Sequence, residues 1–141
     1  MAAVNTRRVA LGALAGGVVW SIWSTIVNVV ILGPRYADAQ GSKLMLAHAR
    51  YSWFMVYWII TIFLLAYVVA WLYSSVRATR GAGPGTALTV GLLVGFAAGF
   101  PMNLSLAAWS PIGRYLPLWW MLDLWLGAII ASLVAGWIYK D

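Results

Sequence analysis

The sequence predicts an all-α membrane protein with four transmembrane helices, and three observations support this fold class. Hydrophobic residues make up 64% of the 141 residues and charged residues only 9%, with no Glu at all, whereas a soluble domain carries about 25% charged residues. Four apolar runs each exceed the roughly 20 residues that a helix needs to cross the hydrocarbon core. Small residues recur at every fourth position, which is typical of packed membrane helices.

The four apolar runs are continuous, and this favours helices over the strands of a membrane barrel, because such strands alternate apolar and polar side chains. Three runs carry no formal charge, and the fourth carries only Asp123. We therefore expect a single four-helix transmembrane domain over residues 1–141. Its predicted helices are Val9–Leu32, Trp53–Val76, Ala87–Trp109 and Leu116–Tyr139.

The first run resembles a signal peptide in two respects: Arg7 and Arg8 precede it, and Ala37-Asp38-Ala39 after it has the small-x-small form of a cleavage site. A signal sequence has an apolar stretch of about 7–15 residues, which is shorter than this run, so we expect a retained helix. Orientation follows from the positive-inside rule. Arg7, Arg8, Arg77, Arg80 and Lys140 would share one side, with Arg35, Lys43, Arg50 and Arg114 on the other. The arginine pairs beside the first two spans favour both termini in the cytoplasm.

The chain also shows signs of an internal duplication, because several residues recur at a fixed offset. Gly12, Gly16, Arg35 and Tyr36 recur as Gly91, Gly95, Arg114 and Tyr115, and Trp71 and Tyr73 recur as Trp137 and Tyr139. This pattern predicts two tandem helical hairpins with the same orientation, a parallel repeat, with an insertion in the first connection at residues 33–52. Coincidence in a chain rich in Gly, Trp and Tyr is the alternative.

Small residues four positions apart lie on one helix face and allow two backbones to approach closely. On the second span we expect no such stripe, because this span is rich in aromatic residues instead. The first, third and fourth spans are therefore expected to form a tight core, with the second more peripheral, against lipid or a partner. The expected packing glycines are Gly12, Gly16, Gly91, Gly95, Gly99 and Gly136.

Polar residues inside a membrane are costly and need a structural or functional explanation. Asp123 must pair, protonate or face water, and Asn103, Asn28 and Arg114 are its candidate partners. Pro101 removes a helix hydrogen bond and is expected to kink the third span beside Asn103. With the termini inside, the polar groups fall in the outer half of the bilayer. They predict an outward-opening polar pocket of Asn28, Tyr57, Asn103, Asp123 and Arg114.

Several kinds of chemistry are not expected from this composition. The chain has no Cys, which excludes disulfides and thiolate metal sites. Its single histidine, His48, and its one plausible acid come with no identifiable nucleophile, so we expect no Ser-His-Asp arrangement. The basic residues are scattered in ones and twos, which favours contacts with lipid headgroups over nucleic-acid binding. We predict no catalytic residue, no metal and no cofactor.

Five stretches of the chain resemble an uncharacterised family of small four-helix bacterial membrane proteins. They are RRVALGALAGG at 7–17, NVVILG at 28–33, VVAWLYSSVR at 68–77, GAGPGTAL at 81–88 and LVAGWIYKD at 133–141. These motifs are helix ends, glycine stripes and turns, so the resemblance implies a fold and a bacterial cytoplasmic membrane rather than an activity.

Together these observations favour a non-enzymatic integral membrane protein, an accessory or structural subunit that packs against a larger complex or a second copy. Two alternatives stay open. One is a small transporter or ligand-binding protein that uses the polar pocket around Asn28, Asn103 and Asp123. The other is an accessory protein that binds lipid, quinone or pigment between its Trp-rich helices.

Overall fold

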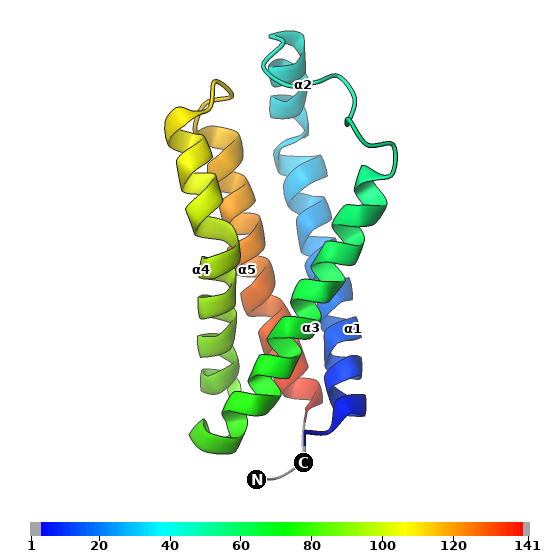
Figure 1. The fold of residues 1–141 in the computed structure, drawn as a ribbon, viewed down its shortest axis with the longest axis vertical. Helices are drawn as coiled ribbons and strands as arrows, with labels where there is room; N and C mark the ends of the chain where they lie inside the picture. The colour runs from blue at the N-terminus through cyan, green and yellow to red at the C-terminus, as the bar shows by residue number, and fades with distance from the viewer. Residues whose placement is uncertain (1–3, 140–141) are drawn as a thin grey trace.

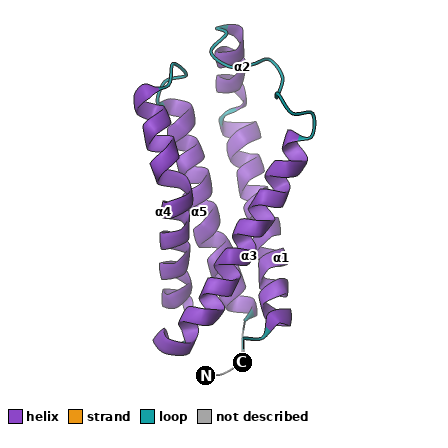
Figure 2. Cartoon of the chain, viewed as in Figure 1, coloured by secondary structure: helices purple, strands orange, loops and turns teal. Residues whose placement is uncertain are grey.

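The computed structural model describes residues 4–139, and every regular element in this range is helical (Figure 2). The all-α fold class is therefore confirmed. In chain order the elements are α1 (Thr6–Thr25), the π-helix η1 (Ile26–Ile31), α2 (Gly33–Gly41), α3 (Phe54–Arg80), α4 (Pro84–Trp109) and α5 (Tyr115–Ile138).

Four helical segments are long and apolar enough to cross a membrane, and they coincide with the four predicted spans. They are α1 with η1 (Thr6–Ile31), α3, α4 and α5. The main difference in bounds is at the end of α3, which continues past Val76 to Arg80. Two arginines in its last turn explain the extension, because cations near a helix C-terminus interact favourably with the helix dipole.

The helices alternate in direction and form two hairpins, α1 with α3 and α4 with α5 (Figure 1). Both hairpins start from the end of the bundle where the two chain ends lie, which we call the terminal end. The opposite end carries α2, and we call it the α2 end. This arrangement agrees with the predicted tandem hairpins, while superposition of the paired residues stays a prediction.

Helix α5 is the centre of the bundle, since it packs against α1, α3 and α4, whereas α1 and α4 barely touch. Of the three helices expected to form the tight core, α1 and α4 therefore each pack on α5 rather than on each other. Glycines line both interfaces. A methyl group added at Gly12 would lie 3.2 Å from the Cα of Ala135, and one added at Gly91 would lie 2.6 Å from the Cα of Ile129.

The remaining predicted packing glycines also lie against a neighbouring helix. Gly16 faces Ala131, Gly95 faces Trp125, Gly99 faces Met121, and Gly136 faces Ala87 and Tyr73. Two glycines outside the predicted set make equally close approaches. Gly17 lies against the ring of Phe63, and Gly127 lies against the indole of the fully buried Trp20.

Helix α3 differs from the prediction in its second half. We expected no small-residue stripe on this span, but Ala66, Ala70 and Ser74 are spaced four apart and all are buried. With Val69 and Tyr73 they face the rest of the bundle, so this half of α3 belongs to the core. The aromatic residues in the first half obscured the stripe. Only residues 54–61 are peripheral, as predicted for the whole helix, because Ile62 is already buried in the core.

The connections before and after α3 also have local explanations. The expected loop at residues 33–52 contains α2, whose start is set by Pro34 in its first turn, where proline is favoured. Between α3 and α4, Gly81 and Gly83 have φ values of 86° and 142°, which only glycine adopts without strain. Pro101 does not end α4, which remains helical to Trp109; a kink there stays a prediction.

Candidate functional site

The one acidic residue within the spans lies in the interface between α1 and α5. These antiparallel helices meet in a constant register, in which each step of four residues along α1 matches a step of four back along α5. Gly12 faces Ala135, Gly16 faces Ala131, Trp20 faces Gly127, and Ser24 bonds to Asp123. Asp123 therefore takes the next position in a stripe of otherwise small residues, and only 1% of its surface is exposed.

The carboxyl group of Asp123 is held by two side chains of the first span. Its Oδ2 accepts a hydrogen bond of 2.8 Å from the hydroxyl of Ser24 and one of 2.9 Å from the amide of Asn28. The indole of Trp23 donates to the backbone oxygen of Asp123 at 3.2 Å. A carboxyl group within a membrane is costly unless it is paired, and these contacts provide that pairing.

The local geometry of the first span places Asn28 at this carboxyl group. Asn28 lies in η1, where the helix widens from the α to the π form, a feature often found at functional sites. The same amide that bonds to Asp123 also donates to the backbone oxygen of Ser24 at 2.9 Å. The π-turn thus brings Asn28 across to α5 while its side chain remains tied to its own helix.

The network continues from Asn28 to the α2 end of the bundle. The hydroxyl of Tyr36 donates to the Asn28 Oδ1 at 2.6 Å and accepts from the indole of Trp120 at 2.6 Å. The rings of Tyr36 and Trp120 are stacked, with centroids 6.3 Å apart. Burial raises the pKa of Tyr36 above its ordinary value of 10.0, and the hydrogen bond from Trp120 opposes this shift. Tyr36 is therefore a neutral donor at physiological pH.

Two buried polar atoms at this interface have no hydrogen-bond partner among the described residues. They are the Oδ1 of Asp123 and the Nε1 of Trp20. Trp20 precedes Ser24 by one helical turn, and its indole lies against Gly127, one turn after Asp123. An acceptor and a donor are thus left unsatisfied one turn apart, although buried polar groups are normally paired.

The structure brings together only two of the five residues predicted to form a polar pocket, Asn28 and Asp123. Asn103 is buried, but it lies on α4 and its amide donates to the Gly99 oxygen of its own helix at 2.7 Å. Among the three candidate partners of Asp123, only Asn28 bonds to it, because α5 turns this residue toward α1 rather than α4. Tyr57 and Arg114 are exposed at the ends of α3 and α5, and neither joins the network.

Three further residues of the network were not predicted from the sequence, namely Ser24, Tyr36 and Trp120. Ser24 had a usable signal, because it precedes Asn28 by four residues and so shares its helix face. Tyr36 and Trp120 had none, since their meeting depends on α2, and that segment was predicted to be loop.

Two cavities of the described residues come into question as binding sites, and neither is lined by Asp123. One, of about 420 Å³, lies between α1 and α3, and the other, of about 440 Å³, lies beside Tyr73, Arg77 and Tyr139 at the terminal end. Within residues 4–139, no three His, Asp or Glu side chains come close enough to hold a metal ion. The Asp123 network is therefore a set of mutually bonded side chains rather than the lining of either cavity.

The fold and the buried network define the class of this protein, a four-span α-helical membrane protein with a carboxyl group held between two helices. The chain matches no protein family, no curated protein and no solved structure. The resemblance to small four-helix bacterial membrane proteins therefore stays a prediction.

Proposed function

We propose that this protein is a non-enzymatic accessory or structural subunit that packs against another membrane protein. The observation that supports this proposal is the exposure of the start of α3. Residues 50–57 are all exposed, so this end of the helix contacts little of its own chain. It is also strongly aromatic, with Trp53, Phe54 and Tyr57 exposed by 67%, 44% and 57%.

Helix association in lipid depends on close packing between helices rather than on a hydrophobic driving force. The preference of aromatic residues for a membrane interface explains Trp53 and Tyr57 by itself, but it does not explain why all of residues 50–57 are exposed. A partner subunit that packs against this end of α3 supplies the missing contacts.

The arrangement of ionisable side chains supports a protein without catalytic activity. Asp123 is buried between α1 and α5 and is bonded to Ser24 and Asn28. His48 is exposed in the connection between α2 and α3. Within residues 4–139, His48 therefore does not join Ser24 and Asp123 in one site, as a Ser-His-Asp arrangement would require.

A second candidate function is transport or ligand binding at Asp123, and it is supported by the unpartnered Oδ1 of this residue. Intramembrane carboxyl groups commonly mark ion or proton pathways. In that case Asp123→Asn would fold and assemble normally but would abolish a pH-dependent activity. The accessory role is favoured because the other carboxyl oxygen is fully engaged within the protein.

Cross-linking from the exposed end of α3 tests the accessory role. The chain has no Cys, so a single cysteine at Met55 is the only thiol. Met102 is the matched control, because both methionines are strongly exposed, by 64% and 68%, near the α2 ends of α3 and α4.

In native membranes, a cysteine-directed cross-linker should join Met55→Cys to another polypeptide, with much less product from Met102→Cys. A product that contains only two copies of this chain would replace the accessory role by self-association. Equal or no cross-linking from the two positions would contradict the proposal.

We further propose that both termini face the cytoplasm of a bacterial cell. Arg7, Arg8, Arg77 and Arg80 lie at the terminal end of the bundle, and the positive-inside rule favours this end in the cytoplasm; Lys140, counted on the same side, lies outside the described residues. Single cysteines at Lys43 and Ala82 should be labelled from outside and inside the cell, respectively. Labelling of position 82 from outside would reverse the orientation.

A further inference from the structure

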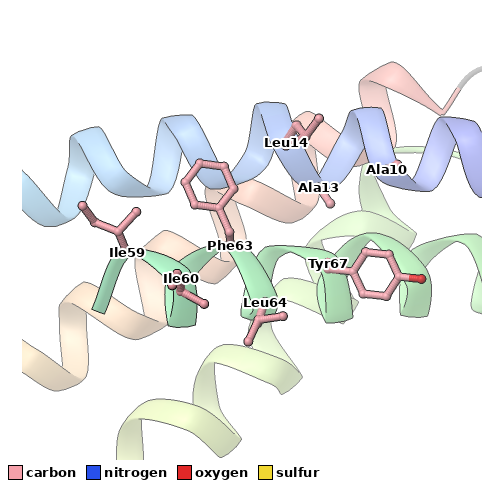
Figure 3. Close-up of a pocket in the computed structure, with 8 residues that line it drawn as sticks. All are labelled: Ala10, Ala13, Leu14, Ile59, Ile60, Phe63, Leu64 and Tyr67. Atoms are coloured by element: carbon pink, nitrogen blue, oxygen red, sulfur yellow. The ribbon is translucent and has the colours of Figure 1, made fainter. Parts of the chain in front are cut away.

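The cavity between α1 and α3 is a groove of about 420 Å³ (Figure 3). Its walls come from Ala10, Ala13 and Leu14 of α1 and from a stripe on α3 that includes Phe63, Leu64 and Tyr67. The tyrosine hydroxyl is the one polar side-chain group among the lining residues. Along α3 the lining runs from Ile59 to Tyr67, about 12 Å of helix at 1.5 Å per residue.

The groove exists because α1 carries small side chains where α3 carries large ones. Ala10 and Ala13 leave space beside the α3 backbone, and the ring of Phe63 fills part of it against Gly17. Tyr67 and Leu64 stand along the open side, exposed by 47% and 62%. The result is an elongated apolar furrow that runs along the helices and is open to the hydrocarbon of a membrane.

A cation lies at the terminal end of this groove. Arg7, Ala10 and Leu14 are spaced three and four residues apart, so they share one face of α1. Arg7 is exposed and lies one turn before the first lining residue. Figure 3 shows the hydroxyl of Tyr67 directed toward the same end of α1. Trp71, one turn further along α3, is 48% exposed, as expected for a side chain at headgroup depth.

The charge at this end is positive throughout the described residues. Arg7, Arg8, Arg77 and Arg80 lie there, and Arg77 donates to the backbone oxygen of Tyr139 at 2.6 Å. Of the three acidic residues, Asp38 is in α2 at the opposite end and Asp123 is buried in α5; Asp141 lies outside the described residues. The terminal end of the groove therefore favours the binding of a negatively charged group.

We propose that this groove is a binding site for one anionic phospholipid, with an acyl chain in the furrow and the headgroup phosphate at Arg7. A long apolar furrow with a cation at one end matches the shape and charge of such a lipid. The site goes beyond the proposed accessory role and does not depend on it, because the lining begins at Ile59, past the exposed first turns of α3.

Native mass spectrometry of the detergent-solubilised protein tests this site. The probes are phosphatidylglycerol and phosphatidylcholine with identical oleoyl chains, titrated separately. Phosphatidylglycerol should bind about five-fold more tightly, the effect expected of one basic side chain beside an anionic headgroup. Arg7→Gln should abolish this preference, while Arg114→Gln, an exposed arginine at the opposite end, should retain it.

A second pair of variants tests the furrow itself. Ala10→Phe fills the groove, and Ala97→Phe adds the same side chain at an exposed alanine of α4. Ala10→Phe should weaken both lipids several-fold, because the added ring takes the space in which the acyl chain packs, and Ala97→Phe should not. Leu64→Trp fills the same groove from α3 and serves if Ala10→Phe does not fold.

Three results would overturn the proposal. One is equal binding of the two lipids by the unaltered protein. Another is an equal response to Arg7→Gln and Arg114→Gln. The last is unchanged lipid binding in a folded groove-filling variant. Cross-linking of Met55→Cys is scored separately, so failure of this site and failure of the accessory role are distinguishable.

Discussion

The two hairpins of the bundle are built on the same plan but are packed in different ways. In the α4–α5 hairpin, Gly91, Gly95 and Gly99 bring one helix backbone onto the other along most of the interface. Hydrogen bonds from Ser132 to the Ala87 oxygen, at 2.6 Å, and from Trp125 to the Leu92 oxygen, at 3.3 Å, add to this contact. In the α1–α3 hairpin the glycine that faces the partner helix, Gly17, meets the Phe63 side chain rather than backbone, and a groove lies nearby.

The difference follows from where each glycine pair points. Gly12 and Gly16 align in sequence with Gly91 and Gly95, but they face α5 rather than α3, their own hairpin partner. Gly91, Gly95 and Gly99 of α4 face their hairpin partner directly. The connections differ as well, since α2 and a long loop separate α1 from α3 while a short turn joins α4 to α5 (Figure 2). Related sequence motifs can thus serve different interfaces.

The largest expected effect on stability comes from forcing α4 and α5 apart. A side chain at Gly91 would meet the backbone of Ile129 at 2.6 Å, and backbone atoms of a packed helix have little freedom to move. Gly91→Leu should therefore lower the free energy of unfolding by about 3 kcal/mol or more. Unfolding in mixed detergent and SDS measures it. Gly85→Leu is the control, because nothing lies within 4 Å of a side chain there; an equal loss in both variants would refute the explanation.

A smaller effect is expected at the α1–α5 interface that joins the two hairpins. Asp123→Leu leaves the donors of Ser24 and Asn28 without their acceptor and should cost about 2 kcal/mol, within the range for buried unpaired groups. Asp123→Asn keeps one acceptor oxygen and should lose less than about 1 kcal/mol. Thermal unfolding in detergent or nanodiscs measures both. Equal stability of the two variants and the unaltered protein would mean that the network does not hold α1 to α5.

A change at Tyr36, near the α2 end of the network, should have a still smaller effect on stability, with a defined pH dependence. Tyr36→Phe removes two hydrogen bonds and should cost about 1 kcal/mol. The raised pKa of Tyr36 means that the folded state favours the neutral phenol. The contribution of Tyr36 to stability is therefore complete below its ordinary pKa of 10.0. It is lost as the pH rises through the raised pKa that Tyr36 has in the folded state.

Unfolding measured at neutral and at alkaline pH tests this dependence. Stability should fall with rising pH more steeply in the unaltered protein than in Tyr36→Phe. Tyr51→Phe, at a tyrosine that is 65% exposed, is the control and should follow the unaltered protein. A pH dependence that persists unchanged in Tyr36→Phe would assign it to other groups.

Most of the fold was predictable because it depends on features that a linear sequence displays. Long apolar runs determine the spans, and glycines four apart mark close approaches. The partner of each glycine stripe was not predictable, since Gly12 has the same local pattern whether it faces α3 or α5. The stripe of Ala66, Ala70 and Ser74 was present in the sequence but was overlooked beside the large aromatic residues of the same span.

The candidate site was predictable only in part. The cost of a carboxyl group in lipid identified Asp123, and the need for a donor identified Asn28 among its possible partners. Asn103 was an equally reasonable partner by depth, and only the rotation of α5 excludes it. The π-turn at Ile26–Ile31 has no sequence signal that we can identify, although it determines where Asn28 points. Tyr36 and Trp120 depend in turn on the placement of α2.

The contrast between the two hairpins is tested most directly by one pair of methyl additions. An added methyl group lies 2.6 Å from the Ile129 Cα at Gly91 and 2.5 Å from the Phe63 ring at Gly17, so the two overlaps are nearly equal. Backbone resists displacement, whereas the Phe63 ring can turn into the groove. The measurement is the free energy of unfolding of Gly91→Ala and Gly17→Ala under identical conditions. Gly91→Ala should lower the free energy of unfolding by about 1–3 kcal/mol, and Gly17→Ala should lower it by at least about 1 kcal/mol less. The intrinsic helix preference for Ala over Gly is common to both variants, so the difference between them reports packing alone. An equal loss at Gly17 would show that α1 and α3 are held as closely as α4 and α5, and would contradict the account.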